Sequence, residues 1–347
     1  MPDPQPGPRE LWRSLGEDGV LAKLSLPGEA QPDPVALAEL LTGLDATLPA
    51  GLVLSVCVQV ATVIPLLRAL SVHSPLAAEV LAQALRGSAV TALAATDAGL
   101  SGSALLDART ELRQAGDDIV LAGGKEWITN ALCCDYALVL ARHSAARHFT
   151  SFSWVLVPAD CPGVAKEPAG NELLSGSGLG HLRFDGVRLG REHLVGGRGR
   201  ALAELALQIR TERLAGALWA RAMCRRVLTG TREYLLARPA DEGMLWDNMA
   251  VRERFGRCVT ELIRLDALCR RGAGGAAEAM ALKSAYADSA ERILSECVAL
   301  RGADSFRDGG LAMLRAQATM FGIAGGASGA MLAGVADHAA ELLEGIR

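Results

Sequence analysis

Aromatic residues, paired cysteines and sequence repeats are all scarce in this chain. Phe, Trp and Tyr make up 4% of the 347 residues, no Cys-x-x-C pair occurs, and no Gly-X-Y or heptad repeat is present. These absences exclude collagen, coiled coils, zinc ribbons and small disulfide scaffolds. Neither sign of charge dominates, because 35 basic and 39 acidic residues leave a formal charge of −4. A general attraction to nucleic acid is therefore not expected.

Apolar residues are abundant instead. They form 50% of the chain, which is enough to bury the core of more than one domain. Eight scattered cysteines are expected to be reduced, buried thiols of a cytoplasmic protein, without a metal site. The start, MPDPQPGPRE, has no apolar stretch and predicts no signal peptide. The apolar run 48–70 contains Ser55, Gln59, Thr62 and Pro65, so we expect a buried helix of a soluble protein rather than a membrane span.

The hydrophobic period changes twice along the chain. Residues 10–89 carry helical patterns, with Asp33 as a candidate N-cap ahead of Pro34. From 90 to 200, short Val-, Leu- and Ile-rich runs separated by Gly, Asp, Asn and Pro predict antiparallel strands. Residues 201–347 are helical again. We therefore predict an α+β, mainly α protein with domains at 1–89, 90–200 and 201–347.

One glutamate interrupts an apolar helical stripe in the third zone. The stripe has spacings of three and four residues, as one face of a helix requires, and consists of Leu202, Leu205, Ile209, Glu212, Gly216, Trp219, Met223 and Val227. An unpaired carboxylate on such a face is costly. Glu212 is therefore expected to line a cavity, to find a partner, or to be held with a raised pKa. A slight rotation of the helix that pairs Glu212 with Arg210 or Arg213 is the alternative.

Several strings occur in the order typical of one family. They are TALAATDAG at 91–99, GKEWITN at 124–130, GLGHLRFDGVRLGREHLVG at 178–196, ERLAGAL at 212–218, LWDNMAVR at 245–252 and FGIAGGASGAML at 321–332. With these motifs the chain resembles the acyl-CoA dehydrogenase family from about residue 10 to 345. The resemblance implies a shortened N-terminal helical domain, a middle antiparallel β-barrel-like domain and a C-terminal four-helix bundle.

The resemblance also implies a cofactor and a substrate class. The cofactor is FAD, and the substrate is an acyl thioester of coenzyme A or of an acyl-carrier protein. A carboxylate would remove the α-proton while the β-hydride passes to flavin N5. Trp127 would pack on the flavin ring, Thr129 would bond near N5, and Ile128 lies between them.

The strand before the WITN motif departs from the family pattern. The hydroxyl groups expected at positions 94 and 100 are absent, because Ala94 and Leu100 stand there. The backbone groups of Leu93, Ala94 and Gly99 need no particular side chain and are expected to keep their flavin contacts. Flavin binding is therefore expected to persist.

The catalytic base has two family positions. In many members it lies in an I-Y-E-G-T-S-E motif, but here Gly325 occupies that position and cannot take a proton. A branch that resembles the long-chain and isovaleryl enzymes carries the base in Glu-Arg-Leu, which Glu212-Arg213-Leu214 matches. We therefore predict Glu212 as the base, with Arg213 and Gly325 at the substrate.

The adenosine half of the FAD site departs further from the family. Arg238 aligns with the arginine that a neighbouring subunit supplies, but Asp241-Glu242 replaces its Phe-Gly pair. Met249 stands at the glutamine position, and the turn at Gly302 lacks the usual Gln-x-His-Gly-Gly. Arg301 is either a phosphate contact or a helix C-terminal charge. A partner subunit with an intact half-site would compensate, so either a homo-oligomer or a hetero-oligomer is expected.

The leading interpretation is an FAD-dependent acyl-thioester α,β-dehydrogenase that is reoxidised by electron-transfer flavoprotein. The alternatives are a non-catalytic or half-site partner subunit of a heteromeric acyl-CoA dehydrogenase, and a flavin oxidase or oxygenase on the same scaffold. Intact WITN and Glu212 favour the first interpretation, whereas the changed adenosine contacts favour the second.

Overall fold

A computed structural model describes residues 6–24, 31–102, 104–170, 172–241 and 243–346. The first five residues of the Pro-rich start and Glu242 lie outside this part of the chain. Contacts divide the chain into two compact units. The sheet unit contains residues 1–37 and 51–212, and the helical unit contains residues 38–50 and 213–347. The three domains with boundaries at 89 and 200 stay a prediction.

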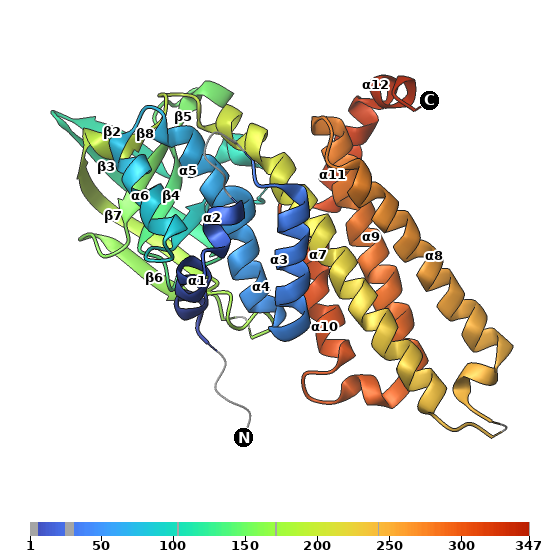
Figure 1. Cartoon of the computed structure of the whole chain (residues 1–347). Helices are drawn as coiled ribbons and strands as arrows, with labels where there is room; N and C mark the ends of the chain where they lie inside the picture. The colour runs from blue at the N-terminus through green and yellow to red at the C-terminus, as the bar shows by residue number, and fades with distance from the viewer. Residues whose placement is uncertain (1–5, 25–30, 103, 171, 242, 347) are drawn as a thin grey trace. The chain divides into compact units, whose positions relative to one another are not determined.

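Helices begin and end the chain, and the strands lie between them (Figure 1). The helices are α1 (Pro8–Glu17), α2 (Val20–Leu24), α3 (Pro34–Thr47), α4 (Ala50–Val58), α5 (Ile64–Ser71), α6 (Pro75–Leu85), α7 (Ala201–Ala237), α8 (Met249–Arg271), α9 (Ala276–Arg301), α10 (Leu311–Ala318), α11 (Ser328–Asp337) and α12 (Ala339–Glu344). The strands are β1 (Thr91–Ala94), β2 (Glu111–Ala115), β3 (Asp118–Ile128), β4 (Tyr136–Arg142), β5 (Phe152–Pro158), β6 (Val164–Pro168), β7 (Gly180–Gly190) and β8 (Leu194–Val195). The predicted order of helices, strands and helices is confirmed.

The sheet has the order β6-β7-β3-β2-β4-β5-β8, and β1 pairs with β4. Successive side chains of β4 point to opposite faces of the sheet, and both faces are buried. Leu138 and Leu140 pack with α5 and α6, whereas Ala137, Val139 and Ala141 face a second core formed among the strands. Because side chains alternate along a strand, one short run contributes to both cores. Figure 1 shows α5 and α6 lying over the sheet.

The pairing of β1 departs from the antiparallel pattern predicted for the strands. Thr91–Ala94 runs parallel to Tyr136–Val139, and Glu111 of β2 pairs in parallel with Arg142. A short hairpin forces neighbouring strands to be antiparallel, but a long connection does not. The chain passes through β2 and β3 before it returns as β4, so a parallel pairing is available to β1.

The long apolar segment Ala50–Ser71 is the one helical stretch in the described ranges that is long and apolar enough to cross a membrane. However, 89% of its most apolar window is buried inside the protein, as predicted for a core helix. Its middle, Gln59–Val63, is a π-helical turn. Such turns interrupt the regular helical bonding and often occur at functional sites. Here the turn carries Gln59, whose side chain bonds to β1.

The helical unit contains the long helices of the third zone. In α8, one face is buried at Phe255, Cys258, Leu265 and Cys269. Earlier in the chain, Asp33 caps α3 by accepting a bond from Ala36 N at 2.8 Å, which confirms the predicted N-cap.

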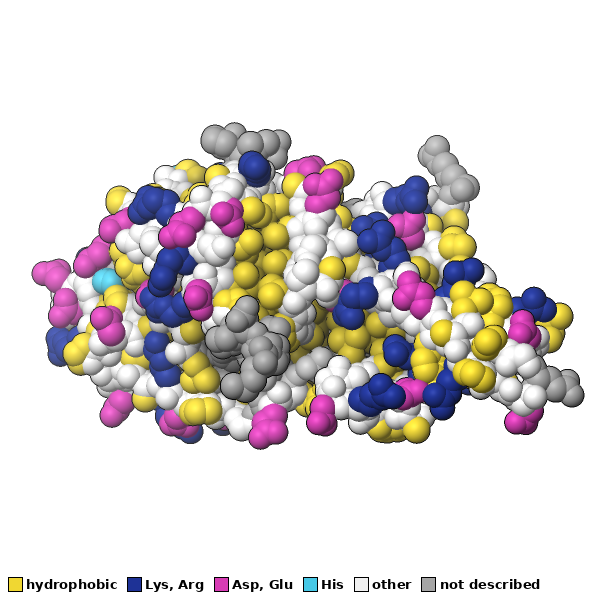
Figure 2. Space-filling model, turned by 60° about the horizontal axis from the view of Figure 1, so that its bottom comes forward, with side chains coloured by type: hydrophobic (Ala, Val, Ile, Leu, Met, Phe, Trp, Pro, Cys, Tyr) yellow, Lys and Arg dark blue, Asp and Glu magenta, His cyan; other side chains and the backbone are white. Residues whose placement is uncertain are grey.

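On the face drawn in Figure 2, basic and acidic side chains are intermixed.

Candidate active site

The sheet unit holds the predicted flavin-contacting segments, and their first element is β1. Ala92 and Ala94 are buried, and Leu93 is half-buried. The side-chain amide of Gln59 makes two hydrogen bonds to the backbone of this strand. Its Nε2 donates to Thr91 O, and its Oε1 accepts from Thr91 N. The π-helical turn of the apolar helix therefore fixes where β1 begins.

A buried ion pair holds the loop after β1. The ammonium of Lys125, which is 0% exposed, contacts the carboxylate of Asp97 and donates to Ala95 O at 3.1 Å and Leu140 O at 2.7 Å. Asp97 also accepts bonds from the backbone amide of Thr110, at 2.7 Å, and from its hydroxyl, at 3.0 Å. The loop is thus tied both to β3 and to the segment before β2.

Burial lowers the pKa of Lys125 to about 8, while the charge of Asp97 and its hydrogen bond act in the opposite direction. That value lies above neutral pH, so the lysine is charged when the pair is intact. A buried ion pair with all its hydrogen bonds made is costly to break on one side only. Asp97 and Lys125 are therefore expected to position the loop rather than to react.

The predicted contacts at Gly99 and Leu100 lie in the turn that follows Asp97. Leu100 N donates to Asp97 O at 3.2 Å, and Gly99 N donates to the carboxylate of Glu126 at 3.0 Å. A glycine amide that donates to a carboxylate is also suited to a phosphate oxygen. The cofactor contacts of Gly99 and Leu100 stay a prediction, and the sequence did not reveal that the Gly99 amide donates to Glu126.

Trp127 lies on a bulge near the end of β3. Lys125 pairs with Leu182 and Ile128 with Gly180, so β3 has one residue more than β7 between these pairs. Trp127 takes a φ of 58°, and its side chain is 57% exposed. A bulky residue in the left-handed region is strained by about 1–3 kcal/mol, and such strain is concentrated at functional sites. The bulge therefore turns a large aromatic ring outward, as a ring platform requires.

The residues around Trp127 hold the bulge in place. His181 of β7 contacts the indole edge-on with a centroid distance of 5.5 Å, and its Nδ1 accepts from Trp127 N at 3.2 Å. Ile128 is buried and Thr129 is half-buried. Asn130, also at positive φ, exchanges hydrogen bonds with Ser55 of the apolar helix.

Glu212 lies on the buried stripe of α7, as predicted. It is half-buried, and Leu205, Gly216 and Trp219 on the same face of the helix are buried. Burial and, second, the charge of Glu212 raise the pKa of the Cys57 thiol to about 12. A charge affects a pKa only over a short range, so the proximity of Glu212 to Cys57, near the end of α4, is an expectation that experiment can test. Sequence reasoning did not single out Cys57.

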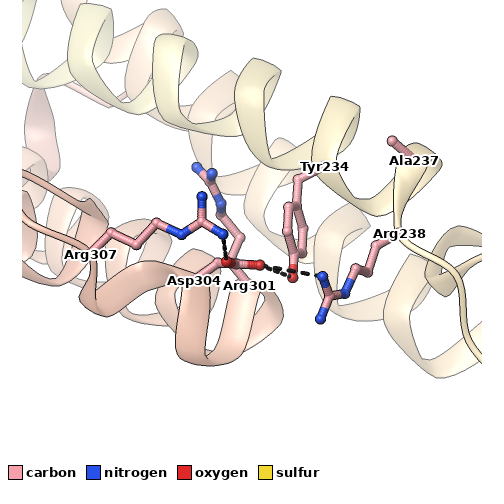
Figure 3. Close-up of a pocket in the computed structure, with 6 residues that line it drawn as sticks. All are labelled: Tyr234, Ala237, Arg238, Arg301, Asp304 and Arg307. Carbon is pink, nitrogen blue, oxygen red and sulfur yellow. Dashed lines mark hydrogen bonds and ion pairs between the residues drawn. The ribbon is translucent and has the colours of Figure 1, made fainter.

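The helical unit holds a second site, formed where α7 and α9 end. It is a pocket of about 280 Å³ lined by Tyr234, Ala237, Arg238, Arg301, Asp304 and Arg307 (Figure 3). Tyr234 Oη donates to Asp304 at 2.8 Å, Arg307 contacts the same carboxylate at 2.5 Å, and Arg238 lies 3.8 Å from it. The bond from Tyr234 and the charges of both arginines lower the pKa of Asp304.

The other predicted site residues of the helical unit, at the cofactor or at the substrate, do not line that pocket. Met249 begins α8 and is 69% exposed, and Gly302 ends α9 at a φ of 58°. Gly325 lies before α11 at a φ of 68°, and Arg213 is buried on α7. Sequence reasoning placed Arg238 at the cofactor and left Arg301 as either a phosphate contact or a helix C-terminal charge, and it missed Tyr234, Asp304 and Arg307. The sequence RGADSFR gives the charges, but not the position of Tyr234 some 70 residues earlier.

Solved structures of other proteins share this arrangement of a central sheet followed by long helices. An acyl-CoA dehydrogenase of Geobacillus kaustophilus has this fold, with a TM-score of 0.88 at 21% identity over 95% of this chain and 90% of that one. A glutaryl-CoA dehydrogenase of Mycobacterium smegmatis, solved in complex with FADH2, gives 0.83 at 23% identity over 95% and 86%.

Family models identify the chain more closely. Residues 92–187 match the acyl-CoA dehydrogenase middle domain and residues 197–340 the acyl-CoA dehydrogenase C-terminal domain. The chain belongs to the acyl-CoA dehydrogenase family, which confirms the predicted family. An acyl-CoA dehydrogenase of Mycobacterium tuberculosis is 26% identical over 69% of this chain and 64% of its own length. The chain spans less than two thirds of the first curated relatives, with matches covering 22% to 64% of their length.

Proposed function

We propose that this chain is an FAD-dependent acyl-thioester α,β-dehydrogenase with Glu212 as its base. The observation that carries the proposal is a half-buried carboxylate on an otherwise apolar face of α7. The family assignment and the exposed ring of Trp127 support FAD as the cofactor. An acyl thioester of coenzyme A or of a carrier protein would be the substrate.

The residues of the sheet unit suit a flavin. Trp127 offers an aromatic face on a strained bulge, and Thr129 next to it offers a hydroxyl. The backbone of Leu93, Ala94 and the Gly99 turn is held by Gln59 and by the Asp97–Lys125 pair. A flavin phosphate would accept the hydrogen bond of the Gly99 amide only by replacing the carboxylate of Glu126.

The reaction divides into two transfers from the substrate. Glu212 removes the proton from the α-carbon and holds it on its carboxyl group. FAD, when bound, supplies the acceptor for the β-hydride. Loss of both leaves an α,β-unsaturated thioester. Hydrogen-bond donors at the thioester oxygen would stabilise the negative charge that develops there.

The test is anaerobic reduction of the bound flavin by a panel of acyl thioesters, followed by its visible absorption. The Glu212→Gln variant should retain flavin. An acyl thioester should reduce that flavin at least about 100-fold more slowly, because no base removes the α-proton. Glu233→Gln is the matched control, since Glu233 is an exposed residue of the same helix. Unchanged reduction in Glu212→Gln would remove Glu212 from the role.

Alkylation of Cys57 tests the position of Glu212 without any turnover. The charge of Glu212 contributes to the raised pKa of the Cys57 thiol, so Glu212→Gln should lower that pKa. A small neutral alkylating reagent at pH 9 to 10 should then modify Cys57 faster, as read by peptide mass spectrometry. An equal rate in both proteins would place the two groups farther apart than proposed.

A half-site subunit of a heteromer is the second candidate function. It is favoured by the pocket at Arg238, where Asp304 already contacts the arginine, and by the exposed Met249. In that case the chain purified alone would hold substoichiometric flavin and gain it with a partner of the same family. We propose electron-transfer flavoprotein as the oxidant of the reduced enzyme in either case.

A further inference from the structure

A glutamine of the N-terminal segment bonds to α7 beside Glu212. Gln31 lies between α2 and α3, and its side-chain amide makes two hydrogen bonds to residues that are 177 and 180 positions further along the chain. Its Nε2 donates to Gln208 Oε1 at 2.6 Å, and its Oε1 accepts from the hydroxyl of Thr211. Thr211 directly precedes Glu212, and all four residues belong to the sheet unit. Gln31 therefore contacts the turn of α7 that carries the proposed base.

The two partners on α7 are buried polar side chains. Gln208 is 6% exposed and Thr211 is 8% exposed. A buried amide or hydroxyl that loses its hydrogen-bond partner is costly, because water does not replace the lost bond. A glutamine amide offers both a donor and an acceptor, so one side chain can bond to both groups. The two bonds of Gln31 therefore constrain this turn of α7 more than bonds at an exposed surface would.

The backbone around Gln31 is itself constrained. Pro32 follows it and is buried, and a residue before proline is restricted to extended conformations. The next residue, Asp33, caps α3 by accepting a bond from Ala36 N at 2.8 Å. The amide of Gln31 is therefore presented to α7 from the fixed start of a helix.

The contact fixes which way this turn of α7 faces. Residues three and four positions apart share one face of a helix, so Gln208, Thr211 and Glu212 lie on the same face. The sequence alone leaves open a rotation of α7 that pairs Glu212 with a neighbouring arginine. Such a rotation would break both bonds of Gln31 and leave two buried polar groups without these partners.

We propose that Gln31 is a positioning residue for Glu212. It acts through α7, by setting the rotation of the turn from which the carboxylate reaches the α-carbon of the substrate. The inference rests on the proposed function, in which Glu212 is the base. A base must lie within hydrogen-bond reach of the proton that it removes. Gln31 therefore affects the rate of proton removal and leaves the binding of flavin and substrate unchanged.

Stopped-flow reduction of the flavin-loaded full chain, without oxygen and at saturating acyl-CoA, tests the proposal. The acyl-CoA is the one that reduces the unaltered chain fastest. Gln31→Leu is similar in size but makes neither bond. Its flavin should be reduced about tenfold more slowly, since a displacement of about 1 Å can slow a reaction about 100-fold. The flavin content and the acyl-CoA concentration that gives half the maximal rate should not change.

The matched control is Gln114→Leu, the same substitution at an exposed glutamine of the sheet unit, which should leave the rate unchanged. An unchanged rate in Gln31→Leu would overturn the positioning role. A loss of flavin in step with the rate would also overturn it, because it would show a general loss of structure.

A second substitution tests whether the effect passes through α7. Thr211→Val removes the hydroxyl and keeps the shape of the side chain, whereas Thr211→Ser keeps the hydroxyl. Thr211→Val should slow reduction, and Thr211→Ser should restore most of the rate. Gln31→Leu combined with Thr211→Val should be no slower than Gln31→Leu alone, because both remove the same bond. Losses that multiply would overturn the shared contact.

Hydrogen exchange of α7 needs no turnover. Gln31→Leu should exchange faster than the unaltered chain in peptides that cover residues 205–216, but not in peptides of α6. Equal exchange would show that Gln31 does not hold α7 and would overturn the proposal.

The two measurements separate the failure of this inference from the failure of the proposed function. If no acyl-CoA reduces the unaltered chain, the proposed function fails and the positioning role fails with it, even where exchange shows the contact. If the unaltered chain is reduced and Gln31→Leu is reduced equally fast, the proposed function stands and the positioning role alone is lost.

Discussion

The two candidate regions use the same kind of ion pair in different surroundings. In the sheet unit, the side chains of Asp97 and Lys125 are 4% and 0% exposed, and backbone groups complete their hydrogen bonds. In the helical unit, Asp304 faces Arg238 and Arg307, whose side chains are 56% and 78% exposed. The first pair is fixed by the groups around it, whereas both arginines of the second are open to solvent.

This difference separates positioning from binding. A buried pair with complete bonding holds its loop in one conformation, since breaking either partner leaves an uncompensated charge. An exposed pair contributes little to stability, so a competing anion can replace one member at low cost. The Asp97–Lys125 pair therefore fixes one conformation of its loop, whereas the contacts around Asp304 impose less constraint.

The largest expected effect comes from breaking the buried pair. Lys125→Met leaves Asp97 charged and buried, and should lower the free energy of unfolding by about 3–5 kcal/mol. Arg307→Gln, which breaks the exposed pair at Asp304, should change it far less. Denaturant unfolding of both variants provides the comparison. If Lys125→Met were as stable as Arg307→Gln, the distinction between a fixed and an exchangeable pair would fail.

A smaller effect is expected at the bulge. Trp127→Gly accepts a φ of 58° without strain, so it should be about 1 kcal/mol more stable than Trp127→Ala, which keeps the strain. Both variants should retain less flavin, because both lose the ring. Thermal unfolding and flavin content after gel filtration give the two readouts. Full flavin retention in either variant would remove Trp127 from the cofactor site.

The sequence predicted the parts of the site that depend on residue identity. Short sequence motifs predicted the family, the fold and the segment that carries Trp127. Helical spacing predicted the stripe that carries Glu212. It did not predict the Asp97–Lys125 pair or the position of Tyr234 beside Asp304. Their members are 28 and 70 residues apart, and only the folded chain brings them together. The π-helical turn at Gln59 was missed because nothing in the local apolar pattern marks it.

The smallest expected effect is a difference in acid stability between the units. The pKa is lowered at three carboxyl groups of the helical unit, Asp266, Glu278 and Asp304, but at one described carboxyl group of the sheet unit, Asp107. A lowered folded-state pKa stabilises the protein above the unfolded value, near 4, and this stabilisation is lost as the pH falls through the folded-state value.

The helical unit should therefore open before the sheet unit as the pH falls from 5 to 3. Pulse-labelling hydrogen exchange, read on peptides of each unit, measures that order. Glu278 accepts the backbone bond of Gly275 and pairs with Arg271, so Glu278→Gln removes one of the groups that lose their stabilisation in acid. It should reduce the pH dependence of opening in the helical unit, while Glu233→Gln, an exposed substitution in the same unit, should not. Earlier opening of the sheet unit would show that its buried pair, rather than the half-buried carboxylates of the helical unit, limits stability in acid.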